Sequence, residues 1–150
     1  MIIMYTDGAC LGNPGPGGWA ALILNDNQKK IFVGYEPQTT NNRMEMMGIL
    51  QGLTLIPQGT KVKIFSDSQY VVKAFEQRWI QKWQKNGWLT AARQPVKNKD
   101  LWMLFSEKAA LYKLEFSWVK GHSGDPFNEM CDVYAKKAID AKKSWTEDLV

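Results

Sequence analysis

The order of its apolar segments is the feature that most restricts the folds open to this chain. Three strand-like segments come first, at Met1 to Thr6, Trp19 to Leu24 and Ile31 to Tyr35. The polar turn Asn25-Asp26-Asn27 separates the last two, which predicts an antiparallel hairpin. After them, strand and helix patterns alternate, and such alternation is typical of parallel strands covered by helices.

The later segments define this alternation. The spacing of Met46, Ile49, Leu50 and Leu53 predicts a helix over Asn42 to Ile56. Close packing on a sheet would explain its glycines, Gly48 and Gly52, each of which costs about 1 kcal/mol relative to Ala. The following pattern predicts a strand at Lys61 to Ser66, a helix at Ser68 to Gln77, a helix at Asp100 to Leu111, a strand at Leu114 to Val119, and a helix from Asp125-Pro126 to about Lys143.

These segments together predict an α/β fold with a five-stranded mixed sheet, made of the antiparallel hairpin and parallel strands and flanked by helices. With 150 residues, of which 45% are hydrophobic, the chain fits one domain over residues 1–150. We expect a loosely held tail at about residues 144–150. The segment of about residues 79–99, which contains a short helix and a loop, is expected to form a basic protrusion.

Cysteine content and hydropathy indicate the compartment. Cys10 and Cys131 are too few for a disulfide framework, and they show no zinc-binding spacing. The apolar amino terminus has no basic leader or cleavage site, and no window approaches membrane-spanning length. We therefore expect a cytoplasmic protein without a membrane partner. A monomer is expected because no long heptad pattern indicates assembly.

Positive charge is concentrated in one part of the sequence. The chain carries a net charge of +4, whereas the stretch from Lys73 to Lys99 has seven cations and one anion, a net +6 that leaves −2 for the remainder. A polyanion would bind at such a segment. Trp79 and Trp83 are four residues apart, on one side of a helix, and we expect them to pack while the neighbouring cations contact phosphate.

Four acidic residues stand at the ends of predicted elements or in helices: Asp7, Glu45, Asp67 and Asp132. Each has an ordinary explanation when taken singly. Asp7-Gly8 fits a turn, Asn42 and Glu45 have the spacing of a capping box, Asp67 can cap the following helix, and Asp132 fits a solvated helix position.

The strands that precede two of these carboxylates indicate where the carboxylates lie in the fold. The first and fourth strands both end in Asp, and parallel pairing would place Asp7 and Asp67 at the same edge of the sheet. Like charges at one edge require cations, and hard oxygen ligands suit Mg²⁺ or Mn²⁺ together with substrate phosphate oxygens. The pattern therefore indicates phosphate-transfer chemistry.

Several motifs resemble those of bacterial type 1 ribonucleases H and occur in that family's order. They are Tyr5-Thr6-Asp7-Gly8-Ala9-Cys10, Gly12-Asn13-Pro14-Gly15-Pro16-Gly17-Gly18, Thr39-Thr40-Asn41-Asn42-Arg43-Met44-Glu45, Ser66-Asp67-Ser68-Gln69-Tyr70, Trp118-Val119-Lys120-Gly121-His122 and Cys131-Asp132. They span nearly the whole chain. The resemblance implies a ribonuclease H-like fold and endonucleolytic cleavage of the RNA strand of RNA-DNA hybrids.

The resemblance also implies a mechanism. Asp7, Glu45, Asp67 and Asp132 would form a catalytic cluster that binds two ions, Mg²⁺ or alternatively Mn²⁺. One ion would help to generate the attacking hydroxide and the other would stabilise the departing 3′ oxygen, leaving 5′-phosphate and 3′-hydroxyl ends. His122, the single histidine of the sequence, would assist catalysis by activating water or releasing product.

Substrate contacts are implied in the same way. Discrimination of a hybrid requires sensing of 2′-hydroxyls on one strand. The resemblance implies that the RNA strand is contacted by Cys10, Asn13, Asn42 and Gln69. It also implies that the groove or a DNA phosphate is approached by Thr40, Asn41 and Arg43. Cations and an amide of the basic segment would bind phosphate: Lys82, Lys85, Lys97, Asn98 and Lys99. Lys73 departs from the family, because many close relatives carry an uncharged polar residue there.

Three alternatives remain open at the level of sequence. A DNA nuclease of the same fold, such as a resolvase or integrase, would share the acidic cluster, although the Gly12 to Gly18 loop and the Thr40 to Glu45 segment disfavour it. A non-catalytic hybrid-binding module would lack a carboxylate, and all four are present. A nucleotide-binding ATPase fold would need a second domain and more phosphate loops than 150 residues offer.

Overall fold

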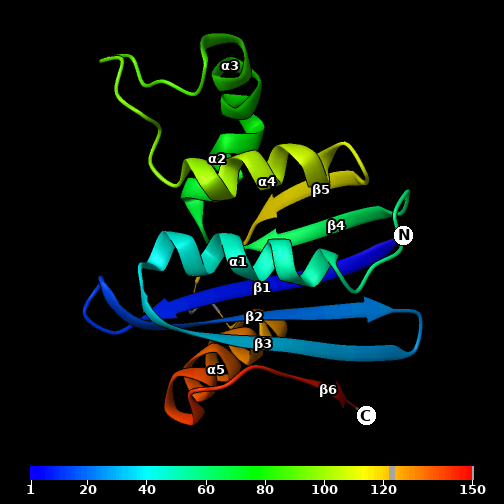
Figure 1. Ribbon diagram of the computed structural model, residues 1–150. Coiled ribbons are helices and arrows are strands. Elements are labelled where there is room, and N and C mark those ends of the chain that lie inside the picture. The colour runs from blue at the N-terminus through cyan, green and yellow to red at the C-terminus, as the bar shows by residue number, and fades with distance from the viewer. Residues whose placement is uncertain (122–123, 150) are drawn as a thin grey trace.

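The computed structural model describes residues 1–121 and 124–149 and contains one sheet in the order β5-β4-β1-β2-β3-β6, with helices on both faces (Figure 1). The elements are β1 (Ile2–Cys10), β2 (Gly15–Asn25), β3 (Gln28–Thr39), α1 (Asn41–Leu53), β4 (Lys61–Ser66), α2 (Gln69–Glu76), α3 (Trp79–Asn86), α4 (Lys99–Ala109), β5 (Lys113–Trp118), α5 (Pro126–Ala141) and β6 (Trp145–Leu149). Within those residues, no helix combines the length and apolar character needed to cross a bilayer.

The pairing of the strands confirms the mixed sheet. β2 pairs antiparallel with β1 and β3, and the hairpin turns at Asp26, whose φ of 53° lies in the left-handed region that Asp tolerates. β4 pairs parallel with both β1 and β5. The strand-helix alternation after α1 therefore produces the parallel half of the sheet, as the sequence predicts.

The sheet has six strands rather than the predicted five. The expectation of a loose tail at residues 144–150 is wrong for residues 145–149, because β6 pairs antiparallel with β3. β3 extends beyond the predicted Ile31 to Tyr35, so its outer edge has backbone groups that need partners. Trp145 and Leu149 then pack on the neighbouring core, and this tertiary contact is what the local sequence does not reveal.

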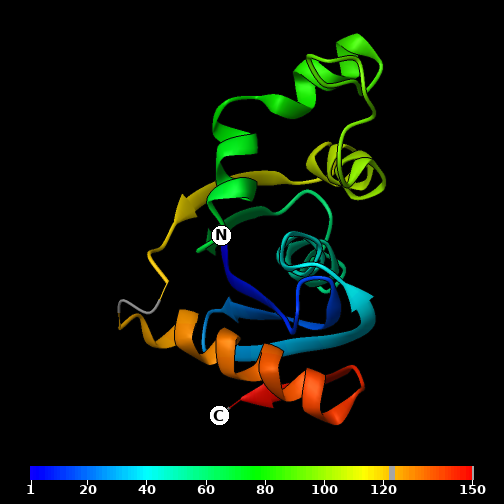
Figure 2. The same ribbon diagram turned by 90° about the vertical axis from the view of Figure 1, so that its left-hand side faces the viewer.

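Two apolar cores lie on the two faces of the sheet. The larger core joins the sheet to α1, α2 and α4, and the smaller core joins β2 and β3 to α5, which lies across the sheet from α1 (Figure 2). The expected close packing of α1 is confirmed at Gly52, where a Cβ would lie 2.4 Å from the Met4 sulfur. α1 and α5 thus approach the same strands from opposite sides.

The basic segment is built on packed tryptophans. α3 stands above α4 and away from the sheet in Figure 1. Trp83 packs against Trp102 of α4, with ring centroids 5.6 Å apart. The rings of Trp79 and Trp88 also pack against Trp83. The interpretation that these tryptophans serve packing is confirmed, and the lysines between them remain exposed.

The position of β6 generates a stability prediction. Trp145→Ala should lower the free energy of unfolding by about 1–2 kcal/mol, because a half-buried indole contributes part of the 1.5–3 kcal/mol of a fully buried large apolar side chain. Chemical denaturation measures the change. Thr146→Ala, at an exposed position of the same strand, is the control and should change stability by less than about 0.5 kcal/mol. Equal effects of the two substitutions would show that β6 is not packed as described.

Candidate active site

The register of two parallel strands brings the first two carboxylates together. Thr6 of β1 is paired with Ser66 of β4, so Asp7 and Asp67 follow paired residues at the same edge of the sheet. Asp67 does not cap α2. Ser68 is the N-cap, and its hydroxyl accepts a hydrogen bond from the Val71 amide at 3.2 Å. The Asp67 carboxylate is therefore available for other contacts at the strand-helix junction.

Glu45 reaches these carboxylates from α1. The helix begins with Thr40 as its N-cap, whose hydroxyl accepts from the Arg43 amide, so the capping-box explanation of Asn42 and Glu45 is wrong. Gly8 permits a close approach between β1 and α1, because a Cβ there would lie 2.5 Å from the Glu45 nitrogen. A side chain at position 8 would push the helix away from the strand.

The three carboxylates form a compact group in which Asp7, Glu45 and Asp67 each offer an oxygen within 4.8 Å of the others. Burial, followed by the charge of Asp67, raises the pKa of Asp7 to about 8. Burial, followed by the charge of Asp7, raises the pKa of Glu45 well above its ordinary value. Burial is also the main cause that raises the pKa of Asp67.

The donor set fits a divalent metal ion. It consists of carboxylate oxygens, which are the ligands that Mg²⁺ and Mn²⁺ prefer. Glu45 Oε2 is buried and has no hydrogen-bond partner among the residues that the structure describes. A buried, unpaired carboxylate oxygen is costly unless a cation compensates it. Asp7, Glu45 and Asp67 are therefore the residues able to hold such an ion.

Asp132 approaches this group from the opposite face of the sheet. The neighbouring Cys131 is fully buried, and its thiol lies 3.4 Å from the Tyr5 carbonyl oxygen, which fixes α5 against β1. Asp132 lines the same pocket as the three carboxylates but lies outside their compact group. Its side chain is 22% exposed and pairs with Lys136 at 3.0 Å. The fourth carboxylate is thus at the mouth of the site.

The pocket above the carboxylates has a volume of about 350 Å³ and is lined by Asp7, Gly8, Asn41, Asn42, Glu45, Asp67, Ser68, Gln69, Tyr70 and Asp132. Sequence reasoning gave no role to Tyr70, whose hydroxyl accepts from Trp102 Nε1 at 2.9 Å. It also missed Asn128, which is buried beside Asp67 and counteracts part of the rise in the pKa of Asp67. The sequence gives one indication of Asn128, which is its polar side chain in the first turn of an otherwise amphipathic helix.

A second pocket of about 570 Å³ gathers predicted nucleic-acid contacts: Asn13, Thr40, Asn41, Asn42, Lys97 and Asn98. It adjoins the carboxylate pocket, because Asn41 and Asn42 line both. Asn13 Oδ1 accepts from the Asn41 amide at 2.9 Å, which ties the loop after β1 to the start of α1. Amide groups and one ammonium in a single hollow can bind a phosphate group.

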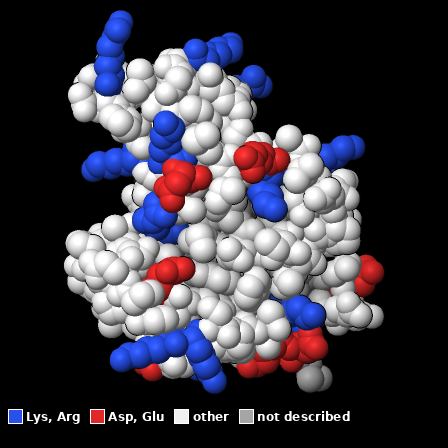
Figure 3. Space-filling view, viewed as in Figure 1, with Lys and Arg blue, Asp and Glu red and all other residues white. Residues whose placement is uncertain are grey.

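The other predicted contact residues have different surroundings. Arg43 is paired with Asp100 through two hydrogen bonds of 2.7 and 2.9 Å, so its guanidinium joins α1 to α4. The half-buried Cys10 thiol contacts the Gly15 and Thr39 carbonyl oxygens. Gln69 is exposed beside Asp67. The structure does not bring Lys82 or Lys85 to the carboxylates. Both lysines are exposed on α3. Figure 3 shows basic side chains spread over this upper part of the molecule.

The predicted catalytic His122 lies outside the described residues. Gly121, which precedes it, lies against the site, since a Cβ at Gly121 would be 3.0 Å from Asp67 Oδ2. The chain thus passes directly beside Asp67 just before this histidine.

Comparison with known proteins agrees with this geometry. The sequence model of the RNase H family matches residues 1–140. The chain belongs to the RNase H family. It is 50% identical over 133 residues to a ribonuclease H of Oleidesulfovibrio alaskensis, a match that covers 89% of this chain and 86% of that protein. It is also 46% identical over 139 residues to a ribonuclease H of Bordetella avium, covering 93% and 90% of the two chains.

Solved RNase H structures share the fold. LC9-RNase H1, described as a type 1 RNase H with the type 2 active-site motif, superimposes with a TM-score of 0.85 at 26% identity, covering 99% of this chain and 77% of that chain. LC11-RNase H1, solved in complex with an RNA/DNA hybrid, superimposes with a TM-score of 0.72 at 21% identity, covering 95% and 99%. These likenesses confirm the ribonuclease H-like fold expected from the sequence.

The raised pKa of Asp7 predicts how the metal-free RNase H domain depends on pH. The pKa is about 8 in the folded state and near 3.8 in the unfolded state, so the stabilising contribution of the protonated carboxyl is complete below about pH 4 and is lost as pH rises to about 8. Asp7→Asn replaces this carboxyl with an amide that does not titrate, so the variant should not lose this stability as the pH rises. In EDTA at pH 8, it should raise stability by at least about 1 kcal/mol, or roughly 2–4 °C in Tm.

Thermal unfolding in EDTA between pH 4 and pH 9 measures this effect. The advantage of Asp7→Asn over the wild type should grow through that window. Asp140→Asn, at an exposed position of α5, is the control for the same chemical change and should show no such growth. If the two variants followed the wild-type curve equally, the carboxylates would not be under mutual electrostatic strain.

Proposed function

We propose that this protein is a metal-dependent endonuclease that hydrolyses the RNA strand of RNA-DNA hybrids. The observation that carries the proposal is the buried group of Asp7, Glu45 and Asp67 next to a pocket rich in amides. Family membership and the hybrid bound by LC11-RNase H1 support the same substrate. The amide pocket distinguishes this site from a bare acidic cluster, because it offers contacts beyond the reacting phosphate.

The carboxylates would perform their role by holding two divalent ions, with Asp132 completing the set. Bound Mg²⁺ would supply an activated water and stabilisation of the departing oxygen. The chain itself positions the scissile phosphate within the pocket and keeps the carboxylates fixed through β1, β4 and α1. Water attacks phosphorus and the bond to the 3′ oxygen breaks, which leaves 5′-phosphate and 3′-hydroxyl ends. His122 would transfer protons at this site.

Recognition of the hybrid would be divided among neighbouring surfaces. Asn13, Asn42, Gln69 and Cys10 would contact the RNA strand, while Thr40, Asn41, Asn98 and Lys97 would hold a phosphate of the DNA strand. Lys82, Lys85 and Lys99 would add attraction that weakens with salt. Arg43, which pairs with Asp100, would approach the groove or a DNA phosphate. We also propose that the enzyme acts as a monomer in the cytoplasm.

A cleavage assay tests this function. The wild type should cut the RNA strand of a hybrid in Mg²⁺, and should leave duplex RNA, duplex DNA and single strands intact. Asp7→Asn should lower the rate by at least about a thousandfold, equal to about 4 kcal/mol of transition-state stabilisation. Asp140→Asn is the matched control and should retain the wild-type rate. The downstream product should carry a phosphatase-sensitive 5′ end.

Other outcomes would contradict the proposal in recognisable ways. Cleavage of duplex DNA would identify a DNA nuclease of the same fold. Hybrid binding without cleavage in either Mg²⁺ or Mn²⁺ would identify a binding module.

A further inference from the structure

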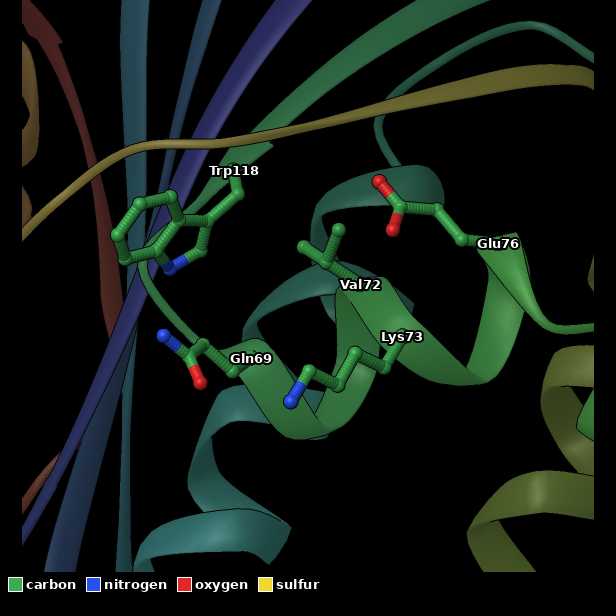
Figure 4. Close-up of a pocket in the computed structure, with 5 residues that line it drawn as sticks. All are labelled: Gln69, Val72, Lys73, Glu76 and Trp118. Atoms are coloured by element: carbon green, nitrogen blue, oxygen red, sulfur yellow. The ribbon is translucent and has the colours of Figure 1, made fainter.

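A groove lies between α2 and the end of β5, beside the site already described. It has a volume of about 320 Å³ and is lined by Gln69, Val72, Lys73, Glu76 and Trp118, shown in Figure 4. We refer to it as the α2–β5 groove. Gln69 is the single residue of this lining for which the sequence motifs imply a substrate contact.

The α2–β5 groove adjoins the carboxylate pocket. Gln69 lines both hollows. Trp118 is held at the junction, because its indole N–H donates to the Asp67 carbonyl oxygen at 3.1 Å. The adjacent Val119 amide donates to the Ser66 carbonyl oxygen at 2.9 Å, which extends the pairing of β4 and β5 to this point. The two hollows therefore meet at Gln69, next to Asp67 and Trp118.

The chemistry of the groove suits a sugar-phosphate backbone. The Trp118 side chain is 44% exposed although it is fixed by its hydrogen bond, so an indole surface faces solvent next to the site. Val72 is buried beneath. Lys73 is exposed, and it forms no ion pair with any carboxylate of the described residues. In Figure 4 its ammonium extends toward Gln69 and away from the carboxylate of Glu76.

We propose that the α2–β5 groove is a subsite for the RNA strand, in which Lys73 binds a phosphate flanking the scissile one and Trp118 packs against the adjoining ribose. This inference rests on the proposed function. The strand in the groove would be the cleaved strand, because the groove adjoins the carboxylate pocket at Gln69, a residue implied to contact RNA. The negative charge of Glu76 limits the subsite at its far end, since a second phosphate there would be repelled. Lys73 thereby sets affinity for the RNA strand without taking part in the chemistry.

The first test compares two variants that lose the same charge. Lys73→Gln removes the ammonium from the groove. Lys113→Gln, the control, removes an exposed ammonium at the start of β5, the strand that Trp118 ends. Hybrid binding is measured in EDTA over a range of salt concentrations, so that no cleavage occurs. Lys73→Gln should raise Kd about 3- to 10-fold at low salt and reduce the salt slope by roughly 0.7–0.9, as expected for one lost phosphate contact, while Lys113→Gln should change Kd less than about twofold.

The second test locates the phosphate. Hybrids are prepared in which one RNA phosphate at a time is replaced by a neutral methylphosphonate. One position close to the cut should weaken binding to the wild type and have no further effect on Lys73→Gln. If no position behaved in this way, or if the two lysine variants bound equally, the subsite would be refuted. Because binding is read without metal, this result is separate from the proposed activity, which fails only if the wild type does not cleave the hybrid in Mg²⁺.

Discussion

The parallel pairing of β1 with β4 is the constraint on which the site depends. It sets Asp7 and Asp67 side by side, and the missing side chain of Gly8 lets α1 bring Glu45 to the same point. Burial then disfavours the ionised form of all three carboxyl groups and raises their pKa values. The fold maintains this unfavourable arrangement through two apolar cores, one on each face of the sheet.

The grouping of three carboxylates at one point makes the composition of the neighbouring hollows important for binding a polyanion. The carboxylates repel a polyanion unless cations intervene, and the second pocket beside them is lined by amides, a hydroxyl and Lys97 rather than by further acids. The amide pocket adjoins the carboxylates through Asn41 and Asn42, and the α2–β5 groove adjoins them through Gln69. The acidic centre is thus bordered by two hollows able to bind a polyanionic backbone, one of which contains Lys73.

Much of this organisation is predictable from sequence because it is local. The hairpin, the helix periodicities and the Asp125-Pro126 start of α5 follow from turn chemistry and apolar spacing, and the structure confirms them. The proximity of Asp7 and Asp67 is also predicted, although β1 continues to Cys10, so Asp7 lies within the strand and not in the expected turn after it. β6 was not predictable, because a polar five-residue strand forms only when the edge of β3 is present. The pairing of Arg43 with Asp100 likewise depends on a contact between distant segments.

A crystal structure with Mn²⁺ would show through anomalous scattering whether Asp7, Glu45 and Asp67 form a metal-binding centre. We expect a Mn²⁺ peak within about 2.0–2.4 Å of carboxylate oxygens from this group, a range that begins at the usual Mg²⁺ distance to oxygen and reaches the short end of the Ca²⁺ distances. Asp7→Asn crystals grown under the same conditions should show a weaker peak. Mn²⁺ bound only elsewhere on the molecule, or an unchanged peak in the variant, would show that these three carboxylates do not form a metal-binding centre.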